Sequence, residues 1–91
     1  MSFQLIFTDT YNRSALRWLK RHSDLRQQYI KTLQLLEANP FHPSLRMHAL
    51  SGKLHGVYSV SINISYRITL ELLIQEEKII PVNVGDHDAV Y

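Results

Sequence analysis

Three stretches of the sequence carry side chains that could move protons or hold a phosphate. The first, residues 48–56, contains two histidines and a lysine, and the second is Arg67. The third, residues 85–91, contains His87 and Tyr91. Histidine suits proton transfer because its ordinary pKa lies near neutral pH, and arginine offers a fixed charge for phosphate oxygens. These residue types therefore suit acid–base chemistry beside a bound phosphate.

Each of these features also has a purely structural interpretation. The chain has five histidines, and a single histidine is more often a half-buried or surface residue than a catalyst. A lone arginine on a strand is usually solvent-exposed, and residues 85–91 could be a polar tail whose Val90 and Tyr91 pack on the core. The sequence contains no metal-ligand spacing, phosphate-binding glycine loop or nucleotide motif, so it predicts neither a metal ion nor a cofactor.

Hydrophobic periodicity predicts the elements that must position these side chains. Residues 3–8 alternate as a short strand with Phe3, Leu5 and Phe7 on one side. A helix capped within residues 8–10 should follow and run to about Arg21. Its apolar stripe comprises Tyr11, Ala15, Trp18 and Leu19.

A second helix is predicted next, with Ser23 or Asp24 as its cap. It should stop at Asn39-Pro40, because asparagine tolerates a left-handed cap and proline cannot continue a helix. Its stripe comprises Leu25, Tyr29, Leu33 and Leu36, with Ile30 beside it. Few residues separate the two helices, which should therefore form an antiparallel hairpin. Residues 41–56 are expected to form a loop with room for one helical turn.

Residues 58–72 alternate between apolar even positions and more polar odd positions. One strand of that length would span roughly 50 Å, whereas a chain of this size folds to about 30 Å across. The segment must therefore turn back, and residues 63–65 are its most turn-like part. This pattern predicts antiparallel strands at 57–62 and 66–73. A turn at 75–78 and a last strand at 79–84 complete the meander, with Pro81 at an edge or non-bonded position.

The order of elements is strand, helix, helix and a three-strand meander, which predicts an α+β fold with the helical hairpin packed on an antiparallel sheet. The length predicts a single domain over residues 1–91. The sequence has no cysteine, no signal-peptide pattern and no apolar run that could cross a membrane, so we expect a cytoplasmic protein.

Charge is distributed unevenly along the chain. Residues 1–56 hold eight Lys/Arg and three Asp/Glu, whereas residues 57–91 hold two Lys/Arg and five Asp/Glu. A basic front half can steer a polyanion, although basic, solvated helix faces are common without any such partner.

Taken together, these stretches resemble the RelE/ParE toxin superfamily, and most of all its YafQ-type messenger RNA endonucleases. The matching segments are residues 48–56 entering the meander, Ser65-Tyr66-Arg67-Ile68 in its middle strand, and residues 85–91. The order of elements agrees over essentially the whole chain. The resemblance implies a toxin of a type II toxin–antitoxin system that cleaves messenger RNA in the ribosomal A site without a metal ion. It implies a cognate antitoxin, messenger RNA and the ribosome as partners.

The resemblance also implies roles for particular residues. His48 and His87 fall where YafQ-type members have catalytic histidines, one as base and the other as acid. Arg67 falls where the RelE branch has a catalytic arginine, and Tyr91 where the family has a C-terminal aromatic side chain that orients a base. The basic helices would grip ribosomal RNA, and the RNA-binding residues implied near the site are Arg46, Lys53 and His55.

The sequence departs from the YafQ-type pattern in the central hairpin, where Ser61 and Ser65 stand in place of a histidine and an aspartate. Two alternatives therefore stay open. The first is a ParE-like inhibitor that binds DNA gyrase without cleaving RNA, since one fold supports both activities. The second is a catalytically degenerate relative that only binds an antitoxin.

Overall fold

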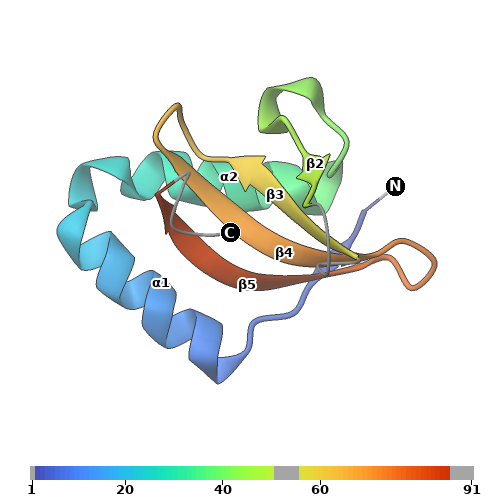
Figure 1. The fold of residues 1–91 in the computed structure, drawn as a ribbon, viewed down its shortest axis with the longest axis horizontal. Coiled ribbons are helices and arrows are strands. Elements are labelled where there is room, and N and C mark those ends of the chain that lie inside the picture. Colours follow the sequence, from blue (N-terminus) through green and yellow to red (C-terminus); the bar gives the residue numbers. More distant parts are fainter. Residues whose placement is uncertain (1, 51–55, 87–91) are drawn as a thin grey trace.

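Five strands in one sheet and two α-helices make up the structure, a computed structural model that describes residues 2–50 and 56–86 (Figure 1). The helices α1 (Asp9–Arg21) and α2 (Arg26–Ala38) are joined by a 3-10 turn, η1 (Ser23–Leu25). Both helices contribute to one hydrophobic core with the sheet. The predicted α+β class, with a helical hairpin packed on a sheet, is confirmed.

The sheet is built around the meander that the alternating segment predicted. β3 (Val57–Ser61), β4 (Tyr66–Leu73) and β5 (Lys78–Asp86) run antiparallel, close to the expected boundaries. β1 (Gln4–Leu5) pairs with β5, and β2 (His48–Ala49) pairs with β3. The strand order is therefore β1-β5-β4-β3-β2, with β2 at one end of the sheet.

The first strand differs from its prediction in length and direction. β1 runs parallel to β5, so the sheet is mixed rather than wholly antiparallel. A parallel neighbour requires a crossover connection, and the two helices supply one between β1 and the meander. Pairing is limited to Gln4 and Leu5 because Thr8 already caps α1. Phe7 turns outward, 43% exposed, and stacks on Tyr11.

Residues 41–56 contain more structure than the predicted loop. The expected helical turn is present as η2 (Pro43–Leu45). The short strand β2 was not predicted, because two residues are too few to produce an alternating pattern. β2 is nevertheless the element that brings His48 beside the meander.

Pro81 lies where the sheet tolerates a residue without an amide proton. Thr69 of β4 pairs with Asn83 of β5, but the next residue, Leu70, pairs with Pro81. The register between the two strands therefore shifts by one residue at this point. Because β1 pairs with β5 only at Lys78 and Ile79, no strand of the described residues 2–50 and 56–86 flanks the outer edge of β5 at Pro81. The predicted edge position is therefore confirmed, with an irregularity beside it.

The first helix begins and ends as its sequence predicts. The Thr8 hydroxyl accepts a hydrogen bond from the Tyr11 amide at 3.1 Å. Asp9 lies in the first turn and Lys20 and Arg21 in the last, which complements the helix dipole. No helix within residues 2–50 and 56–86 is long and apolar enough to span a membrane.

The predicted N-terminal cap of the second helix is wrong, whereas the helix does end at Asn39 as predicted, without the left-handed conformation. Ser23 and Asp24 lie inside the 3-10 turn η1, and no side chain caps α2 at Leu25. Since the connection is so short, η1 continues directly into α2 and leaves no extended residue that could act as a cap. At the other end, Asn39 is extended, with φ −163°, rather than left-handed. Its side chain instead accepts a hydrogen bond from the Phe41 amide at 3.0 Å.

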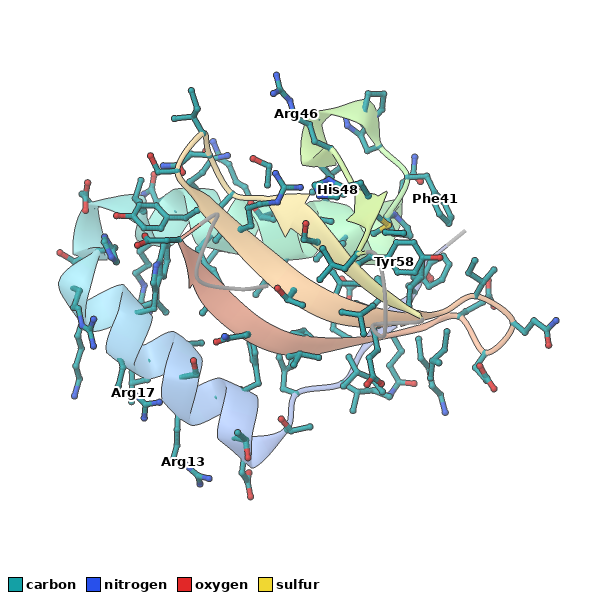
Figure 2. All side chains as sticks on the ribbon, in the orientation of Figure 1. Arg13, Arg17, Phe41, Arg46, His48 and Tyr58 are labelled. Atoms are coloured by element: carbon teal, nitrogen blue, oxygen red, sulfur yellow. The ribbon has the colours of Figure 1, made fainter. Side chains whose placement is uncertain are left out.

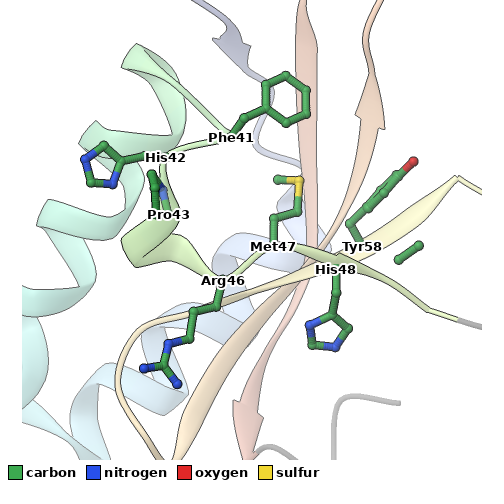
Figure 3. A pocket seen from close by; sticks show the side chains of 8 residues that line it. Phe41, His42, Pro43, Arg46, Met47, His48 and Tyr58 are labelled. Atoms are coloured by element: carbon green, nitrogen blue, oxygen red, sulfur yellow. The ribbon is translucent and has the colours of Figure 1, made fainter.

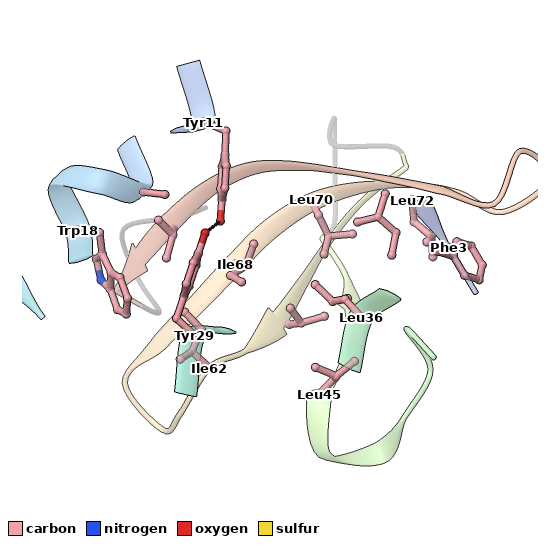
Figure 4. Close-up of a cluster of buried hydrophobic side chains, with 14 residues drawn as sticks. Phe3, Tyr11, Trp18, Tyr29, Leu36, Leu45, Ile62, Ile68, Leu70 and Leu72 are labelled. Atoms are coloured by element: carbon pink, nitrogen blue, oxygen red, sulfur yellow. Dashed lines mark hydrogen bonds between the residues drawn. The ribbon is translucent and has the colours of Figure 1, made fainter. Parts of the chain in front are cut away.

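The core fills the space between the helices and the sheet (Figure 4). It includes five even positions of the alternating segment, Val60, Ile68, Leu70 and Leu72 on the strands and Ile62 just after β3. Between the helices, the hydroxyl groups of Tyr11 and Tyr29 meet at 2.8 Å. Burial is the main cause that raises the pKa of both phenols, which keeps the pair uncharged.

The tyrosine pair should show strong coupling in stability measurements. Tyr11→Phe leaves the buried Tyr29 hydroxyl without its partner and should lower the free energy of unfolding by about 1–3 kcal/mol. The Tyr11→Phe/Tyr29→Phe double variant should lose clearly less than the sum of the single variants, because no polar group is stranded. Urea denaturation of the four proteins tests this expectation, and strictly additive losses would contradict it.

Candidate active site

Three strands bring His48, Ser59 and Arg67 together on the face of the sheet opposite the core. His48 of β2 is registered with Ser59 of β3, and Ser61 of β3 with Arg67 of β4. Side chains alternate along a strand, so these odd positions share one face while the even positions fill the core. The alternation of residues 58–72 therefore directs apolar side chains of β3 and β4 to the core, and it directs Ser59 and Arg67 to the opposite face.

Arg67 is the most heavily bonded side chain of the cluster. Its Nε donates to the Ser59 hydroxyl at 2.9 Å. One terminal nitrogen donates to the Arg46 carbonyl at 2.9 Å and to the Ser59 carbonyl at 3.3 Å, and lies 3.2 Å from His48 Nδ1. Only 6% of Arg67 is exposed, whereas a lone arginine on an outer sheet face is usually solvated. These contacts engage Nε and one terminal nitrogen, which offsets part of the cost of burying the guanidinium.

The Arg46 carbonyl reaches Arg67 because of an unusual backbone conformation. Arg46 follows η2 in the left-handed region, with φ 50°. This conformation reverses the chain after the helical turn and leads directly into β2. The carbonyl of Arg46 then lies against the sheet while its side chain is exposed and extends away from it (Figure 2). Arg67 thus fixes the backbone that precedes His48.

The contact with Arg67 favours one tautomer of His48. A guanidinium only donates hydrogen bonds, so Nδ1 must be the acceptor in its contact with Arg67. The ring proton then lies on Nε2, which is 3.4 Å from the Ser59 hydroxyl. In this assignment His48 is neutral, and it is exposed to solvent. An exposed, neutral and oriented imidazole has the properties that a general base requires.

The structure places some of the predicted site residues and not others. His48, Arg67 and the backbone of Arg46 come together, as described above. The predictions for Lys53, His55, His87 and Tyr91 lie outside the described residues.

Ser59 belongs to the cluster but was not predicted as a site residue. It is fully buried and contacts both Arg67 and His48. The sequence offered one signal for Ser59. Like Arg67, it occupies an odd position of the alternating segment, and it therefore lies on the same face of the sheet as Arg67 on the neighbouring strand. Ser61 and Ser65, by contrast, help to build the hairpin turn: the Ser61 hydroxyl donates to the Asn63 carbonyl, and the Ser65 amide donates to the Asn63 side chain.

Two other histidines have structural surroundings. His22 stacks between Trp18 and Tyr66, with ring centroids 4.8 and 4.5 Å away. His42 uses Nδ1 to accept from Ser44, within its own turn. Across residues 2–50 and 56–86, no three metal-binding side chains gather into a possible metal site.

Comparison with known proteins reveals similarity in structure but not in sequence. No protein-family model and no curated protein matches the chain. A chain of the E. coli DinJ–YafQ toxin–antitoxin complex is 17% identical, with a TM-score of 0.79 over 100% of this chain and 99% of that one. A YoeB/ParE toxin from Agrobacterium tumefaciens is 14% identical, with a TM-score of 0.75 over 93% and 99% of the two chains.

A third similar structure is a chain of a RelBE toxin–antitoxin complex from Mycobacterium tuberculosis, 15% identical, with a TM-score of 0.59 over 96% and 100% of the chains. The fold is that of the RelE/ParE toxins. The predicted resemblance to this superfamily, and to YafQ within it, is therefore confirmed at the level of the fold.

The Arg67 network should be sensitive to a change that keeps the charge. Arg67→Lys retains a cation but loses the planar fork that donates to several groups at once. We expect it to lower the free energy of unfolding by about 1–3 kcal/mol, measured by urea denaturation. Arg17→Lys on the exposed face of α1 is the matched control and should change stability by less than about 0.5 kcal/mol. Equal stabilities of the two variants would contradict the importance of the network.

Proposed function

We propose that this protein is the toxin of a type II toxin–antitoxin system and that it cleaves messenger RNA on the ribosome without a metal ion. The observation that carries the proposal is the contact between Arg67 and His48 Nδ1 at 3.2 Å, on the sheet face opposite the core. The similarity in fold to YafQ, YoeB/ParE and RelBE toxins supports it.

RNA cleavage of this kind needs three groups. A base removes the proton of the 2′-hydroxyl, a cation stabilises the phosphate as negative charge develops, and an acid protonates the leaving 5′-oxygen. His48 is the base in this proposal, because its contacts fit the neutral tautomer. His87 is the acid, and Tyr91 orients the nucleotide by stacking.

Arg67 has two tasks in this mechanism. Before substrate binds, it orients the His48 ring through Nδ1. A phosphate oxygen then competes for the same guanidinium nitrogen, since a charged acceptor binds arginine more strongly than a neutral one. The exchange of partners frees the Nδ1 lone pair of His48 to take a proton. Ser59 holds Arg67 through Nε throughout, so the guanidinium remains in place.

Basic side chains near the site and on α1 would contact the RNA backbone. Arg46 is exposed beside His48, and Lys53 and His55 are proposed to act with it. On α1, the exposed side chains of Arg13 and Arg17 extend away from the molecule (Figure 2). Lys20 and Arg21 continue this exposed basic face, which would hold ribosomal RNA.

A toxin of this kind would work in the cytoplasm and would need an antitoxin to protect its host. The similar YafQ and RelBE structures are described as toxin–antitoxin complexes. We therefore propose a cognate antitoxin as the protein partner.

Substitution of His48 tests the proposed chemistry. His48→Gln keeps a polar side chain but cannot take up a proton at neutral pH, so it should reduce cleavage by about 100- to 10,000-fold. His42→Gln is the matched control, since His42 is exposed, lies on the same segment and bonds only locally to Ser44 among the described residues. The measurement is mapping of new 5′ ends in messenger RNA after expression in a bacterial host without antitoxin.

Three results would contradict parts of the proposal. Full cleavage by His48→Gln would remove His48 from the mechanism. Growth arrest and DNA damage signalling without new 5′ ends would point to gyrase inhibition. Harmless expression of the unmodified protein would point to a degenerate relative that only binds a partner.

A further inference from the structure

A second cavity lies against α1 and shares no described residue with the cavity beside His48. The cavity beside His48 has an apolar wall that includes Phe41 and Met47 (Figure 3). The second has the same volume, about 390 Å³, but it lies between the C-terminal half of α1 and the ends of β4 and β5. Sites for small molecules measure about 300–1,000 Å³, so this space exceeds what a lone phosphate ion needs.

The helix side of the second cavity carries two cations. Arg17 and Arg21 line it one helical turn apart, and both are exposed at its mouth. Arg17 extends outward from α1 (Figure 2). Among residues 2–50 and 56–86, neither arginine has an ion-pair partner. Their two charges exceed the roughly half negative charge at the C-terminal end of a helix, so the mouth attracts an anion such as a phosphate group.

The sheet side of the same cavity is aromatic and acidic. Tyr66 of β4 is half-buried and is registered with the exposed Asp86 of β5. The His22 ring lies 4.5 Å from the Tyr66 ring and 4.8 Å from the Trp18 ring, measured between centroids. Aromatic side chains stack on flat rings, and a carboxylate accepts hydrogen bonds. This side therefore suits a flat aromatic group that donates hydrogen bonds.

Trp18 adds an unused donor to the wall of the cavity. Its side chain is 7% exposed, and its Nε1 is the one buried side-chain nitrogen or oxygen of the described residues without a hydrogen-bond partner. An unpartnered buried donor is costly. A carbonyl oxygen that reached Nε1 after a small shift of the neighbouring rings would remove this cost.

We propose that this cavity binds a phosphorylated guanosine unit, either free or within an RNA chain. Arg17 and Arg21 hold the phosphate at the mouth, and the base lies against Tyr66. Asp86 accepts from the N1 and 2-amino groups of guanine, and the neighbouring 6-carbonyl accepts from Trp18 Nε1. Adenine lacks this order of donors and acceptor, since its N1 accepts and its 6-position donates. Binding here does not depend on the proposed cleavage of messenger RNA.

The test uses the indole N–H of Trp18, the single tryptophan of the chain, as a reporter in two-dimensional NMR. The probes are guanosine 5′-monophosphate, adenosine 5′-monophosphate and inorganic phosphate. We expect the guanosine nucleotide to shift the indole resonance in a saturable way. The adenosine nucleotide should bind at least about tenfold more weakly, and phosphate alone should leave the indole resonance in place.

Variants separate the two sides of the cavity. Arg17→Gln and Arg21→Gln should each weaken binding of both nucleotides by about tenfold, because a charge-assisted hydrogen bond to phosphate is lost. Arg26→Gln is the matched control, since Arg26 is exposed at the start of α2 and does not line the cavity. Asp86→Asn should remove most of the preference for guanine over adenine.

The source of the nucleotide is decided by a comparison with RNA of about six nucleotides that holds one guanosine among uridines. Tighter binding of this RNA than of the free nucleotide assigns the cavity to RNA, and binding of the free nucleotide alone assigns it to a small ligand.

Four outcomes would overturn the proposal. These are an indole resonance that does not move, equal binding of the two nucleotides, an equal shift by inorganic phosphate, and an equal loss of binding in Arg26→Gln. Cleavage is measured separately, so a protein that binds guanosine nucleotides but cuts no RNA keeps this site while losing the proposed nuclease function.

Discussion

The hydrogen bonds of the buried Arg67 guanidinium hold the polar face of the sheet in place. A cation with 6% exposure is stable only when its donors find partners, and the residues that contact this guanidinium come from separate segments. Ser59 belongs to β3, Arg46 ends the η2 turn, and His48 belongs to β2. β2 has only two residues, and their pairing with β3 would by itself hold this edge of the sheet weakly. Arg67 thus positions the edge strand as well as the imidazole that it carries.

The core makes this arrangement possible from the other side of the sheet. The even residues of β3 and β4 pack against the helices, which fixes the strands and so the direction of every odd side chain. A slip of one residue in register would bury Arg67 in the apolar core and expose Ile68. The penalty for burying a charge among apolar side chains is large. Hydrophobic burial on one face and guanidinium bonding on the other therefore select the same register.

The sequence was informative where local patterns decide structure and uninformative where distant contacts do. Alternation predicted β3 and β4 closely, and helical spacing predicted the apolar stripe of α1. The caps at Ser23 and Asp24 failed because the short connection leads straight from η1 into α2, and Asn39 ends the helix in an extended rather than a left-handed conformation. β2 and the role of Ser59 depend on Arg67 reaching across strands, which no local pattern encodes. His48 was predicted from family resemblance, and its tautomer required the structure.

His48 lies on β2, the strand at one end of the sheet order. In the interior of a sheet, a catalytic side chain would be reached only through the substrate face. On β2, the same strand offers the His48 side chain to one face and the Ala49 backbone to the side away from β3. Only two residues pair β2 with β3, so under the proposed function the position of the base depends on the Arg67 contacts as well as on that pairing.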